Sequence, residues 1–443
     1  MLKRTISLVA AAFLLGTFSY AQSLFDYFSD FVQPSQEGQR PEKAIEFDYD
    51  IDFDYYTNIR DFHHSSDLFM ASQHVNMARF SPAFGIKSAQ SGGLTHRLLI
   101  GVNLTKDLGA NPILLSKYSD DETAESQLNA RLFKDIFYYY NLQAALGNGR
   151  FDLFAGIYPR NEMEGDYGRA FLSEDVLMTD PNIEGLLFKY RTPRFFAELG
   201  GDWAGSKGLD RYERYTVFTA GSYGFTDWLS AGWTATYLHV GQSLIFPGDF
   251  DNVMGNPYVK VDFGHNLGIQ ELSLKAGALA SMQIDKSIES TLHFPMGGEA
   301  TFRAKHWNIG LEDTFFYGDN LMPYLSSTYS DDLYIGKYRD YLYQGEPFYF
   351  THRGFASGYD RVELFYEPKV SDALSLKLSA VGHFLLPPTE AFGCFIGWQA
   401  KASVIFNLDG LRAQRKPAAR PAGRRNTRQT TQRPHQDGPA VRL

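Results

Sequence analysis

Residues 45–55, with the sequence IEFDYDIDFDY, combine acidic and apolar side chains in unbroken alternation. Successive side chains of a β-strand point to opposite faces, so one face carries five carboxylates and the other only Ile, Phe and Tyr. A row of carboxylates can line a watery passage and select ions by charge, or bind a divalent cation together with a neighbouring strand. An EF-hand is excluded, because Phe53 and Ile59 stand where that loop needs Gly and Glu.

Histidines offer a second candidate chemistry. His63, His64 and His74 lie near Asp67, but adjacent strand residues point to opposite faces and no zinc-type ligand spacing is present. We interpret them as exposed loop residues, and we expect no metal site and no cofactor.

A hydrolytic site would need a nucleophile, a histidine and an acid in contact. Residues 220–224, AGSYG, resemble a nucleophile elbow but have Ala in place of the first Gly and no helix after them. His239 and Ser243 lie near one rim and keep a barrel hydrolase open as an alternative. The lone Cys394 has no catalytic signature around it and excludes an intrachain disulfide. We expect that the protein is not an enzyme.

The N-terminal residues have the pattern of a secretory signal. Lys3 and Arg4 precede a short apolar run from Ile6 to Leu15, and the segment ends at Ala21. This run is too short to cross a bilayer, and no Cys follows it, so we expect a signal peptide over 1–21, cleaved before Gln22.

Alternating segments recur along the chain. Residues 272–282 put Leu and Ala opposite Ser, Lys and Gly, and residues 229–237, 374–380 and 396–406 repeat the pattern. No apolar run reaches the roughly 20 residues of a transmembrane helix. With 27 Tyr, 36 Phe and 40 Gly, the composition favours many short strands with turns and interfacial aromatic rings.

Loop lengths decide between a sandwich and a membrane barrel. Short turns are expected at 90–93, 147–149, 192–193, 225–227, 264–268, 305–306 and 368–372. Longer connections are expected at 57–77, 106–131, 159–181, 205–211, 243–255, 284–295, 318–357 and 387–393. This alternation predicts an all-β, transmembrane antiparallel up-and-down barrel of about 16 strands, with 14 or 18 as alternatives. Both termini and the short turns would face the periplasm, and the eight long connections would face outward.

Strand parity then assigns side chains to the lumen. The predicted pore-lining residues are Glu46, Asp48, Asp50, Asp52, Asp54, Lys260, Asp262, Glu271, Lys275, Glu299, Arg303, Glu312, Lys377 and Lys401. Closing the barrel would bring Lys377 and Lys401 beside the acidic residues of the first strand and leave a residual negative field. The tryptophans predicted for the interface girdle are Trp203 on the outer side and Trp228 and Trp307 on the periplasmic side.

Two segments lie outside the predicted barrel of residues 44–410. Residues 22–43 are expected to form a periplasmic arm. Residues 411–443 carry nine Arg or Lys against one Asp, with no apolar periodicity, and are expected to form a disordered basic tail.

The signal, the alternating strands, the loop rhythm and the final VIFNL at 404–408 resemble Gram-negative outer-membrane porins, and FFAELGGDW at 195–203 is similar in style to strands of phosphate- and sugar-type porins. The resemblance covers about residues 44–408 and is architectural, since no motif identifies a substrate. It implies an outer-membrane channel for passive diffusion of small hydrophilic solutes. The excess carboxylates favour a cation-preferring or neutral-solute pore.

Partners follow from this placement. Outer-membrane lipids and small hydrophilic solutes are expected, and the signal peptide removes nucleic acid as a partner of the basic tail. The tail could contact an envelope polyanion. The sequence assigns no oligomeric state. The Tyr-rich segment 318–357 keeps a surface assembly, adhesion or carbohydrate-binding barrel open as an alternative.

Overall fold

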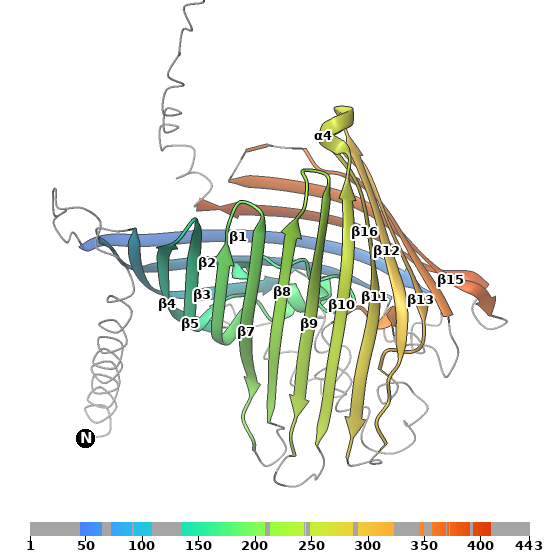
Figure 1. Ribbon diagram of the computed structural model, residues 1–443, viewed down its shortest axis with the longest axis horizontal. Helices are drawn as coiled ribbons and strands as arrows, with labels where there is room; N and C mark the ends of the chain where they lie inside the picture. The colour runs from blue at the N-terminus through green and yellow to red at the C-terminus, as the bar shows by residue number, and fades with distance from the viewer. Residues whose placement is uncertain are drawn as a thin grey trace, which may run out of the picture.

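The computed structural model describes residues 45–63, 72–90, 93–108, 135–208, 213–242, 244, 249–286, 291–322, 345–349, 357–368, 370–371, 373–389 and 393–408. Within them, sixteen antiparallel strands close into one barrel, in which each strand pairs with its sequence neighbours and β1 pairs with β16 (Figure 1). The predicted up-and-down barrel is confirmed, with sixteen strands rather than 14 or 18.

The strands are β1 (Ile45–Phe62), β2 (Gln73–Gln90), β3 (Leu94–Asp107), β4 (Asp135–Leu146), β5 (Gly149–Pro159), β6 (Asn182–Arg191), β7 (Phe195–Gly205), β8 (Arg214–Gly224), β9 (Leu229–Val240), β10 (Phe250–Asp262), β11 (Glu271–Asp285), β12 (Met296–His306), β13 (Ile309–Gly318), β14 (Ser357–Tyr366), β15 (Leu374–Thr389) and β16 (Gly393–Asn407). The short helices are η1 (Arg160–Glu162), α3 (Glu174–Thr179), α4 (Gly264–Leu267) and η4 (Pro347–Tyr349). No helix in the described ranges is long and apolar enough to cross a membrane.

Short turns gather at one end of the barrel, the end that carries α4 in Figure 1. Between β12 and β13, Trp307 and Asn308 have φ of +50° and +66°, the two positive values of a type I′ hairpin that matches strand twist. The turn predicted at 305–306 therefore falls later, because β12 continues through His306.

Several predicted long connections are shorter than expected, because the strands extend past the apolar band. β1 and β2 stay paired as far as Arg60 and Gln73, although residues 57–77 were expected to be a loop. β15 runs to Thr389 and β16 begins at Gly393, so the expected connection 387–393 is mostly strand. These extensions were not predicted because they carry polar residues on both faces, so the alternation of apolar and polar residues is lost. His74, for example, points outward and lies within hydrogen-bond distance of Thr57.

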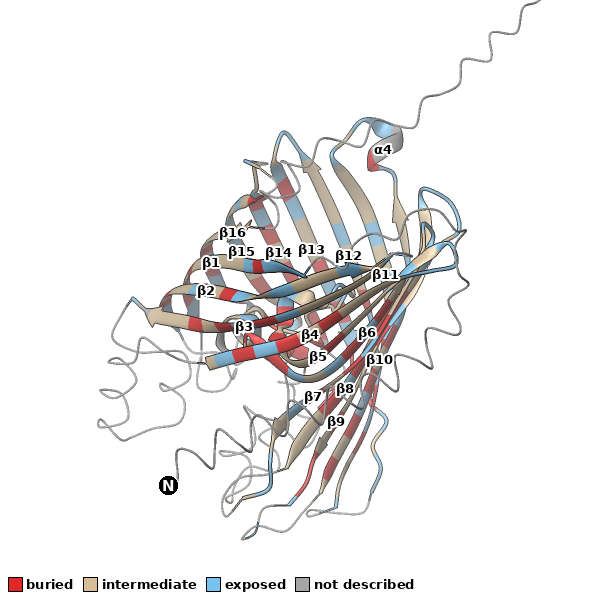
Figure 2. Cartoon of the chain, turned by 90° about the vertical axis from the view of Figure 1, so that its left-hand side faces the viewer, coloured by how far each residue is buried: buried red, intermediate tan, exposed pale blue. Residues whose placement is uncertain are grey.

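The two faces of the barrel wall differ in polarity, and exposed and buried residues alternate along the strands (Figure 2). Large apolar side chains stand exposed on the outward face, among them Phe47, Ile100, Leu199, Val259, Leu364 and Trp398. The side chains between them point into the barrel and make its ion pairs. An exposed apolar wall around a polar interior is the arrangement of a membrane-spanning barrel, in which lipid covers the outer face.

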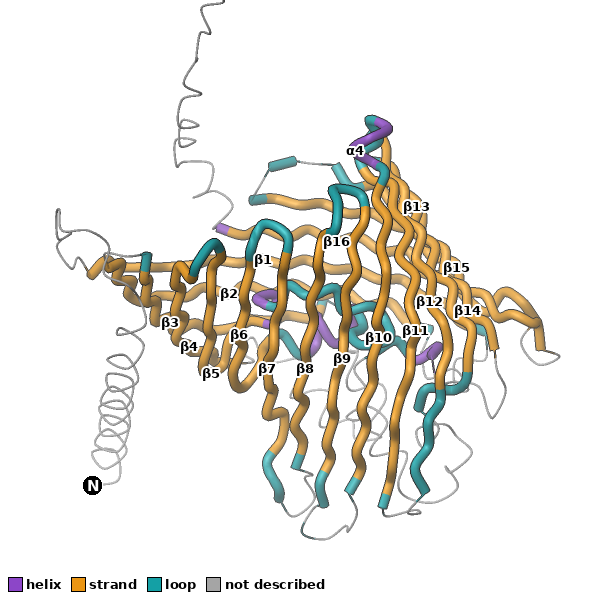
Figure 3. Tube along the Cα trace, in the orientation of Figure 1, coloured by secondary structure: helices purple, strands orange, loops and turns teal. Residues whose placement is uncertain are grey.

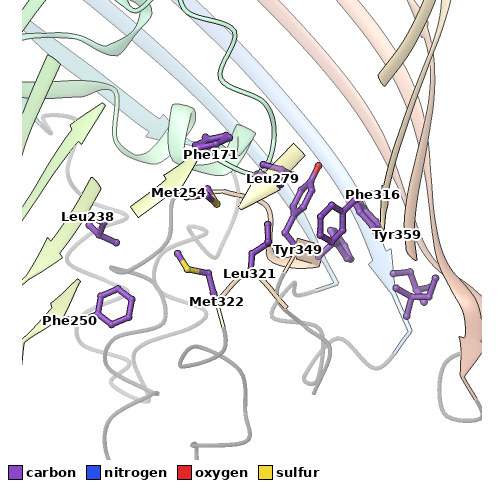
Figure 4. Close-up of a cluster of buried hydrophobic side chains, with 14 of the residues drawn as sticks. Phe171, Leu238, Phe250, Met254, Leu279, Phe316, Leu321, Met322, Tyr349 and Tyr359 are labelled. Atoms are coloured by element: carbon purple, nitrogen blue, oxygen red, sulfur yellow. The ribbon is translucent and has the colours of Figure 1, made fainter. Parts of the chain in front are cut away.

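The hydrophobic core lies inside the barrel. One cluster joins Phe171, Leu321, Met322 and Tyr349 of the connections to wall residues such as Phe316 (Figure 4). A second cluster includes Leu99, Phe137, Tyr139, Phe154, Tyr158 and Leu187 from the inward faces of β3 to β6. The lumen is therefore partly filled by side chains and loops.

One polar feature breaks the apolar outer wall. Asp313 on β13 lies opposite the exposed Phe302, and Asp360 on β14 lies opposite the exposed Phe315, so both carboxyl groups are on the outward face. Asp313 lies opposite Val362, two residues from Asp360, so the two carboxyl groups are diagonal neighbours on adjacent strands. Two like charges side by side disfavour each other, and facing lipid adds a desolvation cost.

We predict that replacing this pair stabilises the barrel. Asp313→Leu with Asp360→Leu should raise the free energy of unfolding in lipid vesicles by about 1–2 kcal/mol, because carboxyl groups on a lipid-facing wall are destabilising. Urea titrations of the folded protein in vesicles measure the change. Asp152→Leu is the control: it removes a lumen carboxylate that pairs with Arg150, and it should not raise the free energy of unfolding. A double variant less stable than the parent would mean that the pair does not face lipid.

Candidate functional site

The connection between β5 and β6, residues 160–181, folds into the barrel. It contains η1 and α3, and its helix and loop segments are drawn inside the wall in Figure 3. Ser173 caps α3, its hydroxyl accepting a hydrogen bond from the backbone N–H of Val176. Sequence reasoning expected this connection to face outward. Its charged residues instead find partners on the lumen wall, which holds it inside.

Arg160 anchors both ends of the connection. Its guanidinium, with 3% of the side chain exposed, bonds the carboxylate of Asp202 on β7 at 3.1 Å and that of Asp180 at 2.8 Å. It also donates to the backbone carbonyls of Asp180 and Asn182. One buried cation therefore ties the start of the connection to its end and to the wall.

Glu198 on β7 forms the second anchor. Its carboxylate accepts the backbone N–H groups of Glu164 at 3.0 Å and Gly165 at 2.9 Å. A Cβ on residue 165 would come within 2.3 Å of the Ala220 side chain, so only glycine fits there. Lys189 on β6 adds a 2.9 Å ion pair to Glu164.

The connection then crosses to the opposite strands. The carbonyl of Asp166 accepts a hydrogen bond from Thr234 on β9 at 2.8 Å, and its carboxylate pairs with Lys275 on β11 at 2.9 Å. These contacts attach the connection to the lumen wall at β9 and β11.

Arg169 is the centre of the charge network. Its guanidinium pairs with Glu174 at 3.1 Å, Glu346 at 2.8 Å, Glu363 at 3.2 Å and Glu312 at 3.4 Å. Its carbonyl accepts the N–H of Glu346 at 2.7 Å, which joins the β5–β6 connection to the β13–β14 connection. Burial alone would lower the pKa of Arg169, but the surrounding carboxylates outweigh it and raise the pKa well above its ordinary value.

Glu174 links this network to the last strands. Lys401 on β16 pairs with both its carboxylate oxygens, at 2.8 and 2.9 Å. Burial would raise the pKa of Glu174, but the charges of Lys401 and Arg169 outweigh it and hold the pKa well below its usual range. Lys377 and Arg361 both pair with Glu363, each at 2.7 Å.

The acidic face of β1 is paired by arginines that sequence reasoning missed. Arg97 on β3 pairs with Asp48 and Asp50, and Arg79 on β2 pairs with Asp54 at 2.7 Å. Lys377 and Lys401 were expected to lie beside this acidic face, and both line one cavity together with Asp52 and Asp54. Those lysines make their ion pairs with Glu363 and Glu174 instead.

A cavity of about 320 Å³ lies between α3 and the wall of β1, β2, β15 and β16. Charged residues of both signs line it, with serine and asparagine between them and an apolar patch at Leu177 and Met178. The polar lining residues include Asp54, Tyr56, Arg79, Asn103, Lys377 and Ser403. The arrangement can hold a small polar solute by hydrogen bonds and opposite charges.

All fourteen predicted pore-lining residues occupy inward-facing positions by strand register. Within this set Arg303 pairs with Glu271 at 2.5 Å and Glu312 at 2.7 Å, while Glu299 accepts the hydroxyl of Tyr349. Lys260 and Asp262 lie at the short-turn end of β10. Their part in conduction stays a prediction.

The three predicted girdle tryptophans are exposed. Trp307 lies in the β12–β13 turn with 80% of its surface exposed, and Trp228 precedes β9 at the same end. Trp203 lies near the opposite end of β7. Contact with lipid headgroups stays a prediction.

The hydrolase and metal candidates do not assemble in the described ranges. Ser222 lies within β8, so 220–224 is strand and not an elbow; His239 points outward, and Ser243 lies outside the described residues. The described residues hold no group of three or more His, Cys, Asp or Glu able to bind a metal. Residues 1–44 and 409–443, with the predicted signal, arm and tail, also lie outside the description.

Comparisons with known proteins give structural likeness only. No family model and no curated protein matches the chain. A loop-deletion mutant of OmpT, an outer membrane protein of Vibrio cholerae, is 10% identical with a TM-score of 0.47, covering 82% of this chain and 99% of that one. OprD of Pseudomonas aeruginosa is 11% identical with a TM-score of 0.40, covering 82% and 96%. A double variant of OccD1 (OprD) is 11% identical with a TM-score of 0.40, covering 85% and 100%.

We predict that Arg169 keeps the β5–β6 connection in the lumen. Arg169→Met leaves buried carboxylates without their cation, which costs about 3–5 kcal/mol when one partner of a buried pair is removed. Single-channel conductance should therefore rise, while heat-modifiable migration on gels checks that the barrel still forms. Arg169→Lys, which keeps the charge, should have a conductance between that of the parent and that of Arg169→Met. Unchanged conductance in the Met variant would contradict this role.

The pH dependence of the connection follows from Glu174. A carboxyl with a depressed pKa stabilises the folded arrangement fully above its ordinary pKa, near 4.3, and loses this as pH falls through the folded value. A fluorophore on Leu177→Cys, in a Cys394→Ser background, should report the same environment from pH 7 to pH 5 and change only in stronger acid. Glu174→Gln should show the changed environment already at pH 7.

Proposed function

We propose that the protein is an outer-membrane channel through which small hydrophilic solutes diffuse. The observation that carries this is the pairing of an apolar outer wall with a polar, ion-paired lumen narrowed by residues 160–181. A closed barrel leaves no unpaired strand edge in lipid, and a polar lumen gives solutes a watery route.

The lumen favours cations or neutral solutes over anions. The connection brings Glu162, Glu164, Asp166 and Glu174 inside against Arg160 and Arg169. Fixed charges at a constriction select ions by sign. Because most of these groups are paired, the preference should be modest.

The alternatives have less support. A surface assembly or adhesion barrel would need the Tyr-rich segment 318–357 to face outward. In the described part of this segment, Tyr349 instead lies inside the barrel, where it is buried and donates a hydrogen bond to Glu299. No Ser–His–acid contact supports a hydrolase in the described ranges, and we propose that the protein is not an enzyme. Export by a signal peptide over 1–21 and envelope-polyanion contact by the basic tail belong to the same proposal.

Reversal potentials across a planar bilayer in a salt gradient test the selectivity. The wild type should prefer cations modestly, and Asp48→Asn with Asp50→Asn and Asp52→Asn should shift the reversal potential toward anions, because Arg97 loses its partners. Asp61→Asn on the outward face of the same strand is the matched control and should shift nothing. A wild-type channel that strongly prefers anions would overturn the proposed selectivity, and no conductance at all would overturn the channel.

A further inference from the structure

A row of polar and aromatic side chains crosses the outward face of the barrel near the end opposite the short turns. Tyr215 on β8, His239 on β9 and Asp251 on β10 are register partners, and Ile284 on β11 continues the row. These strands stand at the front of Figure 1. Each residue lies one position from its strand end, where the apolar wall gives way to the rim.

Aromatic rings form a platform along this row. Trp203 on β7 stacks on Tyr215 with ring centroids 5.9 Å apart and planes 19° apart, and Tyr215 stacks on His239 at 4.9 Å. Trp203 keeps 50% of its surface exposed. Its outer face is a flat apolar surface of the kind on which a sugar ring can stack.

Hydrogen-bonding groups adjoin the platform. Asp251 accepts from the Tyr237 hydroxyl at 2.8 Å, lies 2.7 Å from Nδ1 of His239 and pairs with Lys286 at 3.2 Å. The Lys286 side chain is 51% exposed, so the ammonium can also donate to a group in the membrane interface. Glu213 lies on the rim side of His239 and adds a further acceptor beside the ring.

Apolar and then small side chains continue from the platform toward the middle of the wall. Next to the row come Val217, Tyr237, Val253 and Met282, followed by the small residues Thr219, Ala235, Gly255 and Ala280. A Cβ on Gly255 would meet no atom within 4 Å, so the space above it is open. At Gly221, by contrast, the ring of Trp233 already fills the space.

An ordinary interfacial tryptophan does not need these polar groups. Trp228, at the other end of the barrel, stacks on Phe263 at 5.7 Å and 15°, and no ion pair in the described ranges accompanies it. Both ends therefore present an aromatic stack, and at the short-turn end the His306 ring lies 4.7 Å from Trp307. Within the described ranges, a carboxylate, an imidazole and an ammonium in mutual contact adjoin the Trp203 stack and not the Trp228 stack.

We propose that this face binds one molecule of a glycolipid of the outer leaflet. The sugar ring stacks on Trp203, a phosphate of the headgroup pairs with Lys286, the headgroup hydroxyls donate to the carboxylates, and an acyl chain lies over Gly255 and its small neighbours. The proposal rests on the outer-membrane placement proposed above, because only there do sugar headgroups and acyl chains meet the wall at this level.

Native mass spectrometry of the purified full chain in detergent tests the site, with an acylated, phosphorylated disaccharide lipid as the probe. Trp203→Leu and Lys286→Ala should each weaken the apparent affinity about fivefold or more. Gly255→Leu should also weaken the affinity, because the new side chain occupies the open space above residue 255. Trp228→Leu is the matched control and should leave binding unchanged.

The ligand's parts can be separated in the same assay. The probe stripped of its acyl chains and phosphatidylglycerol should both bind more weakly than the intact glycolipid. The glycolipid site would be overturned if Trp203→Leu and Trp228→Leu lost the same affinity for the probe. It would also be overturned if phosphatidylglycerol bound as tightly as the intact glycolipid. Conductance of the same preparations is recorded separately, so that a conducting protein without glycolipid preference refutes this site alone, and a non-conducting protein refutes the channel.

Discussion

The structure depends on the closure of β1 against β16. In a bilayer no water satisfies backbone N–H and C=O groups, so an open sheet edge would leave a row of them unpaired in hydrocarbon. Closure joins Asp52 to Asn407 and continues through Phe62 and Gly397. It fixes register around the ring, and register in turn decides which side chain of every strand faces lipid and which faces the lumen.

Closure also creates an electrostatic problem, because it encloses many charges in one lumen. Ion pairs between strands and inward-folded connections solve it. Arg169 alone contacts carboxylates from two connections and from β13 and β14. A buried charge without a partner is costly, so each ion pair favours the arrangement in which the others also form. The connection 160–181 is therefore a fixed part of the folded barrel.

The local sequence pattern could predict which strand residues face outward or inward. It could not predict the ion-pair partners of those residues or the connections that fold into the lumen. Alternation in 45–55 and 272–282 identified the outward and inward faces, because parity is a property of a single strand. The partners of the acidic face were missed because Arg79 lies in a segment read partly as loop and Arg97 in a strand whose inward face is mixed with Leu99 and Gly101. Arg169 and Glu363 are 194 residues apart, and only the assembled barrel brings them together.

The number of anchors bears on how the lumen can work. Residues 160–181 are held at Arg160, at Glu164 and Gly165, at Asp166, at Arg169 and at Glu174, by partners on strands from β7 round to β16. Moving such a segment requires several buried pairs to break together, since releasing one leaves the others in place. The interior arrangement of residues 160–181 is therefore fixed in shape and in charge, because no single broken pair frees the segment from the wall.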